Sequence, residues 1–177
     1  MIKRIFVVFI LTLFINNSYA KENIMILKLK DGDVLIELFG EIAPKHVERF
    51  IMLTKEKKYD GVVFHRVIEG FMAQTGDVEY GNSNSKNYDL KRAGTGGSSY
   101  PDLKAEFSEL PHEKGTLSMA RSAHPNSANS QFFICFQDCS FLDGQYSIWG
   151  QVIEGMEFVD SITRGEPPKD PDKILKM

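Results

Sequence analysis

Neither a cluster of basic residues nor an apolar run long enough for a membrane span is present in this chain of 177 residues. The formal net charge is -3. A nucleic-acid surface depends on lysine and arginine that neutralise phosphates, so this composition argues against nucleic acid as a partner. A spanning helix needs about 20 apolar residues. The longest apolar stretch, residues 5–15, is far shorter.

Cysteine is scarce as well. The chain has two, Cys135 and Cys139. An extended chain advances about 3.3 Å per residue, so their Cα atoms lie beyond disulfide reach unless the chain turns sharply. Cys135 lies in an apolar run and is interpreted as a core thiol, with a disulfide as the alternative. No second pair of ligands accompanies the cysteines, and the histidines have no metal spacing, so we expect no metal site.

Obvious nucleophiles and phosphate loops are also lacking. Ser127 and Ser130 have no apparent His–Asp partners, so a serine hydrolase is a poor fit. Residues 94–97 (Gly-Thr-Gly-Gly) do not sit between a strand and a helix, so they are not a phosphate loop. We expect these glycines to let the backbone approach a binding groove.

The first twenty residues have the composition of an export signal. Lys3 and Arg4 precede the apolar run, and small residues follow at Ser18 and Ala20. This order predicts a signal peptide over residues 1–20, cleaved before Lys21, and a mature domain over residues 21–177. An uncleaved anchor is the alternative. Cleavage would leave no stable membrane association, and we expect a protein of the periplasm.

The remaining chain predicts a mainly β domain. Strands are expected where apolar and polar residues alternate or where short apolar runs lie between turns: residues 24–30, 34–38, 62–67, 71–75, 115–120, 131–136, 146–153 and 174–177. Helical spacing predicts one helix of about three turns from Pro44 and a short one over residues 155–164. Residues 78–100 are rich in Gly, Ser and Asn and predict a long surface loop. An antiparallel barrel or sandwich with two helices follows.

Two motifs carry the chemistry. Residues 64–77 place Arg66 close to Phe71, Met72 and Gln74, and residues 130–134 with 141–146 add further aromatic and amide side chains. A cation beside an apolar pocket, with an amide to hold a ligand, can bind an apolar group and polarise one of its atoms. Rotation of a prolyl peptide bond requires this combination.

These motifs resemble those of the cyclophilins. The similarity runs from about Ile24 to the C-terminus, and Pro125 to Gln131 resembles bacterial members more than animal cytosolic ones. The resemblance implies a closed eight-stranded antiparallel barrel capped by two helices. It further implies peptidyl-prolyl cis-trans isomerase activity without a cofactor. We expect a monomer that acts on proline-containing unfolded or partly folded polypeptides.

The resemblance also assigns roles to residues. Arg66 is the catalytic donor, and Gln74 orients Arg66 or the substrate carbonyl. The backbone near Ala120 and Arg121 pairs with the peptide. The other expected substrate-binding residues are Phe71, Met72, Gln131, Phe133, Phe141, Leu142 and Tyr146.

The chain departs from the best-known animal members at several positions. Phe141 replaces a tryptophan, which removes an indole N–H donor and puts cyclosporin binding in doubt. Tyr146 replaces a histidine. The loop over residues 121–125 is one residue longer. The segment Val78–Gly94 is an insertion that could shape peptide preference.

Two plainer interpretations stay open. Arg66 taken alone could be a surface ion-pair residue, and His65 on the opposite face of its strand is expected to be a hydrogen-bonded structural histidine. The rival function is a non-catalytic proline-peptide-binding module or chaperone with the same fold. Retention of Arg66 favours the enzyme, because binding alone needs only the pocket.

Overall fold

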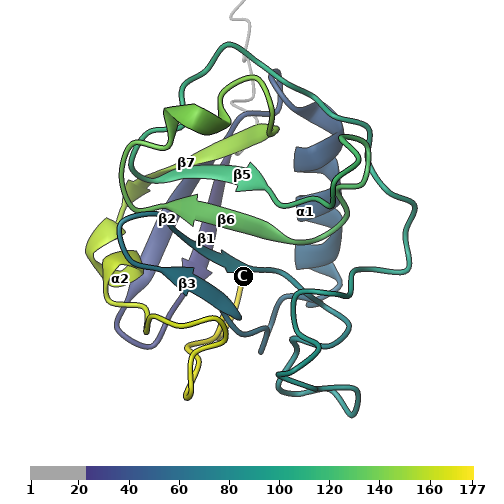
Figure 1. Cartoon of the computed structure of the whole chain (residues 1–177), viewed down its shortest axis with the longest axis vertical. Helices are drawn as coiled ribbons and strands as arrows, with labels where there is room; N and C mark the ends of the chain where they lie inside the picture. Colours follow the sequence, from purple (N-terminus) through teal and green to yellow (C-terminus); the bar gives the residue numbers. More distant parts are fainter. Residues whose placement is uncertain (1–22) are drawn as a thin grey trace, which may run out of the picture.

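The computed structural model describes residues 23–177, and the predicted signal peptide and its cleavage site lie outside these residues. Seven strands form one antiparallel sheet in the order β1-β2-β7-β5-β6-β4-β3 (Figure 1). The elements in chain order are β1 Ile24–Lys28, β2 Asp33–Leu38, α1 Pro44–Lys55, β3 Arg66–Ile68, β4 Met72–Thr75, β5 Thr116–Met119, β6 Phe132–Cys135, the 3-10 turn η1 Ser140–Leu142, β7 Ile148–Glu154 and α2 Met156–Asp160.

An aromatic cluster fills the interior of the curled sheet. Phe50 of α1 stacks on Trp149 of β7 with ring centroids 3.7 Å apart, and its ring meets Phe132 of β6 edge-on at 5.0 Å. Tyr59 stacks on Phe50 and donates its hydroxyl to the Ser130 carbonyl. All these rings are fully buried. Large aromatic side chains dominate core energetics, so this cluster anchors α1 to the sheet.

The first hairpin and α1 confirm the sequence pattern. Lys28 pairs with Asp33 across the turn that contains Gly32. A Cβ on Gly32 would lie 2.3 Å from the ring of Phe158 in α2, so a glycine here lets the hairpin approach α2 closely. Pro44 occupies the first turn of α1, where its missing N–H is not needed.

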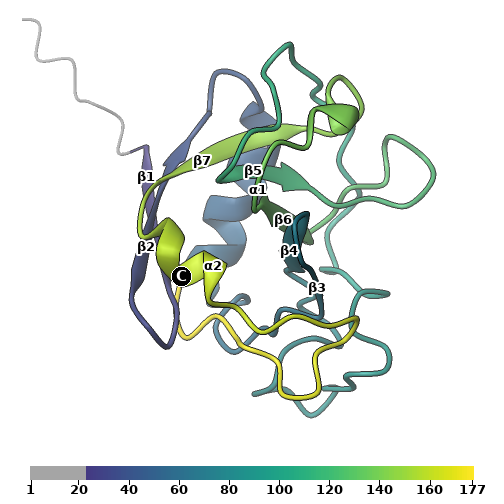
Figure 2. The same ribbon diagram turned by 60° about the vertical axis from the view of Figure 1, so that its left-hand side comes forward.

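The predicted closed eight-stranded barrel is not confirmed. In place of an eighth strand, residues 174–177 contain a single isolated bridge, between Lys176 and Lys28. Val63 bridges Lys173, and Val67 bridges Gly165. The C-terminal segment, residues 161–177 (yellow in Figure 2), therefore contacts β1 as well as the chain near β3. Its hydrogen bonds alternate between partners, which prevents a continuous ladder.

Two other predicted elements are shorter than expected. Of the expected strand 62–67, only Arg66 and Val67 belong to the sheet, in β3. Val63 and Phe64 instead donate their N–H groups to two different segments, at Gly81 and Asp172. The second helix ends at Asp160 rather than near residue 164. The Arg164 guanidinium bonds the carbonyls of Asp160 and Ile162, which closes this turn.

The loop that follows β4 is a long series of turns, as predicted, and residues 77–100 contain no sheet strand. Asp77 is fully buried and holds this loop together. Its carboxylate accepts N–H groups from Glu79, Tyr80, Gly94 and Gly96 at 2.8–3.0 Å. One buried side chain thus fixes both ends of the insertion.

A second apolar cluster lies on the opposite face of the sheet from the aromatic core. Strand alternation separates the two, because neighbouring residues on β6 point to opposite faces. Phe132 and Ile134 belong to the core, whereas Phe133 and Cys135 belong to this outer cluster. Its buried members are Met72, Phe133, Cys135, Cys139 and Leu142.

Candidate active site

Strand register brings the two predicted motifs together on this outer face. Arg66 of β3 pairs with Gln74 of β4, and Gln74 pairs in turn with Phe133 of β6. Phe133 pairs with Ser118 of β5. Residues directly opposite each other across antiparallel strands share one face of the sheet. The cation, the amide and the aromatic ring therefore form one row across three strands.

A cavity of about 130 Å³ opens beside this row. We call it the apolar pocket. It is lined by nine of the eleven predicted site residues: Arg66, Phe71, Met72, Gln74, Ala120, Arg121, Phe133, Leu142 and Tyr146. Its volume is several times the roughly 30 Å³ that one water occupies in the liquid. It can therefore hold a small apolar ring.

Arg66 stands at the solvent-facing side of the apolar pocket, with 42% of its side chain exposed. Its Nε–H donates to the Glu166 carboxylate at 2.6 Å. Among residues 23–177 the guanidinium has no other hydrogen bond, so its Nη groups are available to a ligand. Glu166 was not among the residues predicted from the sequence, because it lies 100 positions away in the C-terminal segment.

The Gln74 amide donates to Gln131 Oε1 at 3.0 Å and not to Arg66. The predicted alternative, in which Gln74 orients the substrate carbonyl, stays a prediction. Gln131 in turn donates to the carbonyls of Gly94 and Gly96 at 3.0 and 2.7 Å. Gln131 does not line the apolar pocket but lines a larger polar cavity next to it. It links β4 to the glycine loop.

A second, polar cavity of about 480 Å³ adjoins the apolar pocket and shares Gln74, Ala120 and Arg121 with it. The glycine loop over residues 94–97 forms one of its walls, as expected for a backbone that approaches a groove. Gly94 has φ +100°, and a Cβ there would lie 2.9 Å from the His65 ring. Glycine is therefore required at this position.

Ala120 and Arg121 are partly engaged within the protein. The Ala120 N–H donates to the Gln131 carbonyl at 3.0 Å, so it is not free for a peptide. The Arg121 guanidinium donates to the Gln145 carbonyl at 3.0 Å and lies 4.4 Å from the centroid of the Tyr146 ring. Arg121 thus fixes one wall of the apolar pocket.

Phe141 lies outside the apolar pocket, at its rim. It is 64% exposed, and its ring centroid is 5.4 Å from that of Phe71. Leu142 next to it is buried. Tyr146 meets Phe133 edge-on at 5.8 Å. An exposed aromatic ring at the rim can pack on a bound ligand.

Sequence reasoning also missed His112. This buried side chain bonds Asp143 through Nδ1 at 2.8 Å and Ser118 through Nε2 at 3.0 Å. The His112 hydrogen bonds lower the pKa of Asp143. The connectivity is that of a Ser-His-Asp triad, but Ser118 is fully buried, so no substrate can reach its hydroxyl.

The other histidines and the cysteines have structural environments. His65 is buried as expected, but its ring nitrogens find no hydrogen-bond partner among the described residues, contrary to prediction. Cys135 and Cys139 are both free and buried, and burial raises the pKa of each thiol. Residues 23–177 hold no group of three or more His, Cys, Asp or Glu side chains suited to a metal. They also contain no helix with the length and apolar character that a membrane crossing requires.

Residues 24–177 match the family model for cyclophilin-type peptidyl-prolyl cis-trans isomerases. The chain belongs to this family. A relative in Brucella suis, described as a "probable peptidyl-prolyl cis-trans isomerase", is 58% identical over 160 residues, which cover 88% of this chain and 81% of that protein. A peptidyl-prolyl cis-trans isomerase of Helicobacter pylori is 37% identical over 83% of this chain and 84% of its own length.

Solved structures agree with this family assignment. A cyclophilin from Hirschia baltica matches with a TM-score of 0.75 and 30% identity over 87% of this chain and 72% of that one. A cyclophilin-type isomerase of Cryptosporidium parvum, crystallised in the presence of the dipeptide Ala-Pro, matches with a TM-score of 0.72 and 30% identity, covering 85% and 94% of the two chains. The protein is therefore a cyclophilin-type peptidyl-prolyl cis-trans isomerase.

Proposed function

We propose that this isomerase assists the folding of exported proteins by rotating X-Pro bonds in unfolded or partly folded chains, with Arg66 as the catalytic donor. The observation that carries the assignment is the position of Arg66 beside the apolar pocket, with its Nη groups uncommitted among residues 23–177. The Ala-Pro dipeptide used with the Cryptosporidium relative supports a proline-containing ligand.

The mechanism follows from the peptide bond itself. Its rotation barrier is about 18–20 kcal/mol, because the nitrogen lone pair is delocalised into the carbonyl. The lone pair becomes localised on nitrogen only in the twisted state. A guanidinium N–H aimed at that nitrogen therefore binds the transition state more strongly than either ground state.

The two cavities bind different parts of the substrate peptide. The apolar pocket takes the proline ring, with Phe71, Met72, Phe133, Leu142 and Tyr146 around it. The polar cavity next to it takes another part of the extended peptide. Phe141 at the rim adds apolar contact. No step in this mechanism needs a cofactor or a covalent intermediate.

The test is a protease-coupled isomerisation assay on a proline tetrapeptide. We expect Arg66→Ala to lower kcat/KM about 100- to 1,000-fold, the usual loss when one transition-state donor is removed. Arg66→Lys should restore little, because an ammonium lacks the planar fork of donors. Stability should change little, because both side chains of the Arg66–Glu166 pair are about half exposed.

Near-full activity in Arg66→Ala would contradict this mechanism. A wild-type chain that binds proline peptides without turning them over would instead support the non-catalytic binding module or chaperone. The exposed Phe141 ring is the feature that such a module would use.

We further propose export to the periplasm, supported by the basic start and the apolar run of residues 1–20. Cleavage before Lys21 would release residues 21–177 as a soluble monomer. N-terminal sequencing of the protein from a periplasmic extract is expected to begin at Lys21. An intact Met1 on a membrane-bound form would reverse this assignment.

A further inference from the structure

His112 lies behind the apolar pocket and has no part in the mechanism described above. Its side chain is 1% exposed and does not line the apolar pocket. Yet every polar group of this residue contacts an element that carries a wall of the apolar pocket or packs directly behind it. These contacts form two arms.

The first arm reaches the loop that contains Phe141 and Leu142. Asp143 Oδ1 accepts both the backbone N–H and the Nδ1–H of His112, each at 2.8 Å. The His112 carbonyl accepts the Cys139 N–H at 2.7 Å. Three hydrogen bonds thus fix the two ends of the 139–143 loop against His112. Leu142, one wall of the apolar pocket, lies between them.

The second arm reaches the sheet. The imidazole lies nearly parallel to the Phe133 ring, with centroids 6.3 Å apart and an interplanar angle of 16°. His112 Nε2 lies 3.0 Å from Ser118 Oγ, and Ser118 is directly opposite Phe133 in the sheet register. The ring is therefore held against the same row that carries Gln74 and Arg66.

The proton positions follow from the partners. The His112 hydrogen bonds lower the pKa of Asp143, so its carboxylate is charged and Nδ1 must carry the proton. At the other ring nitrogen, Nε2 lies 3.0 Å from Ser118 Oγ, and the Ser118 hydroxyl donates to the Ser147 carbonyl at 3.1 Å. The imidazole therefore makes one side-chain hydrogen bond in each arm.

We propose that His112 is a positioning residue that sets the distance between the Leu142 and Phe133 walls of the apolar pocket. This inference rests on the proposed function of the apolar pocket. The two walls come from separate elements, β6 and the 139–143 loop, and His112 is bonded to one and stacked on the other. A misplacement of about 1 Å can cost about 100-fold in rate, so the wall spacing affects turnover directly.

The test compares two buried histidines that each bond a carboxylate through Nδ1. His46 is fully buried and bonds Glu106, whereas His112 bonds Asp143. We expect His112→Gln to lower kcat/KM about 10-fold per folded molecule, the equivalent of about 1.4 kcal/mol. His46→Gln should lower the Tm but leave kcat/KM within about twofold, because its partner lies at α1 and not at the apolar pocket.

Two further readouts separate positioning from general stability. The Leu142 methyl resonances should shift in His112→Gln and stay in place in His46→Gln. His112→Asn keeps an amide N–H at the δ position for Asp143, so it should recover part of the lost kcat/KM.

If His112→Gln yields no folded protein, Ser118→Ala removes only the distal hydroxyl and should lower kcat/KM about threefold.

A His112→Gln enzyme with kcat/KM within twofold of wild type, or an unchanged Ser118→Ala enzyme if the first variant does not fold, would overturn the proposal. This outcome differs from the one expected if the proposed active site were wrong. If the active site were wrong, Arg66→Ala would keep its activity. A normal loss in Arg66→Ala together with an unaffected His112→Gln would refute the positioning role alone.

Discussion

At the scale of single residues, the contacts of Arg66 decide what its charge can do. The Arg66–Glu166 ion pair is half exposed on both sides. An exposed pair contributes little to stability. The ion pair instead orients the guanidinium, because the bond is made through Nε and leaves the Nη groups free to donate to a ligand. The same chemistry would not follow from an arginine bonded through both Nη groups.

Phe141 permits a prediction about inhibition. In the family, tryptophan at this position donates its indole N–H to cyclosporin and packs on the drug. Phenylalanine at the exposed rim keeps apolar contact but cannot donate. A lost hydrogen bond to a buried partner costs about 1–3 kcal/mol, or roughly 5- to 150-fold in affinity. We expect weak inhibition by cyclosporin and tighter inhibition of Phe141→Trp.

The measurement is an inhibition titration of both forms against the same proline peptide. Turnover without the drug should change less than inhibition does, because Arg66 and the apolar pocket are untouched. Tight inhibition of the native chain, unaltered in Phe141→Trp, would show that other contacts dominate.

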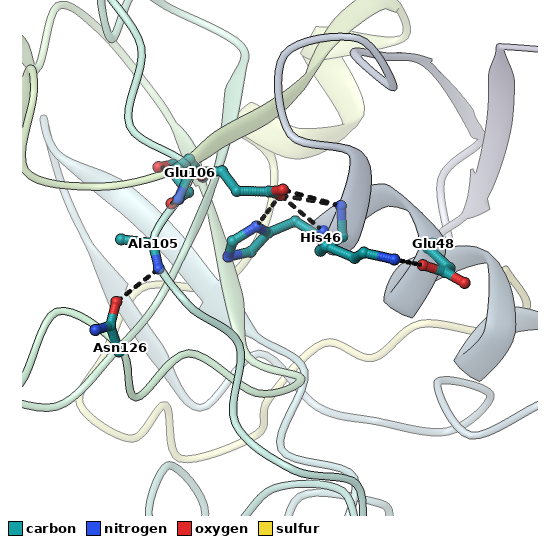
Figure 3. Close-up of polar contacts among 8 residues, drawn as sticks. His46, Glu48, Ala105, Glu106 and Asn126 are labelled. Atoms are coloured by element: carbon teal, nitrogen blue, oxygen red, sulfur yellow. Dashed lines mark hydrogen bonds and ion pairs between the residues drawn. The ribbon is translucent and has the colours of Figure 1, made fainter.

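At the scale of elements, α1 depends on a distant residue for its N-terminal cap. Ala43 provides no side-chain cap. Glu106 accepts the N–H groups of Lys45 and His46 at 3.0 and 3.1 Å and contacts His46 Nδ1 at 2.6 Å (Figure 3). A carboxylate is also favourable at the positive end of the helix dipole. The segment around Glu106 thus replaces a local capping residue.

We predict that Glu106→Ala destabilises the protein by about 2–4 kcal/mol, from a lost cap and an unpaired buried imidazole nitrogen. Glu48→Ala is the matched control on the same helix, because within residues 23–177 Glu48 forms an ion pair only with the exposed Lys45, at 2.9 Å. Urea denaturation should show a much smaller change for the control. Equal changes in the two variants would mean that Glu106 does not cap α1.

At the scale of the whole molecule, the C-terminal segment covers both edges of the sheet. Leu175 donates to the Lys28 carbonyl on β1, and Gly165 exchanges two hydrogen bonds with Val67 on β3. Unpaired edge strands invite association with other chains, and a covering segment suppresses it. In this open sheet, single bridges therefore protect part of each edge strand, whereas in a closed barrel a full ladder of hydrogen bonds would protect it.

Buried histidines predict how global stability depends on pH. Burial lowers the pKa of His65, against the opposing influence of Asp77, and burial likewise lowers the pKa of His46 against Glu106. Both rings are then neutral in the folded protein. The unfolded chain takes up their protons below its ordinary pKa of about 6.5. Stability should be full above that pH and fall as the pH drops below it.

The free energy of unfolding is expected to fall by up to about 1.4 kcal/mol per pH unit for each such histidine. Asp143 and Asp172 have lowered pKa values, so their contributions persist until about pH 4. Denaturant titrations at pH 7.5, 6.5 and 5.5 test the histidine range. His65→Gln should flatten the profile there, and an unaltered slope would exclude His65 as a cause.

Local patterns in the sequence were sufficient for much of the fold and of the site. Strand alternation and turn residues predicted the first hairpin, β4 to β7 and α1, because these features depend on neighbours within a few residues. The family resemblance, based on the motif around Arg66 and on the later motifs, predicted nine residues that line one cavity. The family assignment followed from the same motifs, since their order and spacing encode the strand register that aligns Arg66, Gln74 and Phe133.

The tertiary structure alone decided which distant residues hold these groups. Glu166 lies 100 positions from Arg66, Glu106 lies 60 from His46, and Asp143 lies 31 from His112. Such contacts leave no periodicity in the sequence, because each depends on how separate loops fold back on the sheet. The short C-terminal bridges and the Gln74–Gln131 bond arise in the same way. Local sequence patterns therefore predicted which residues form the candidate site, and chain folding determined which residues orient them.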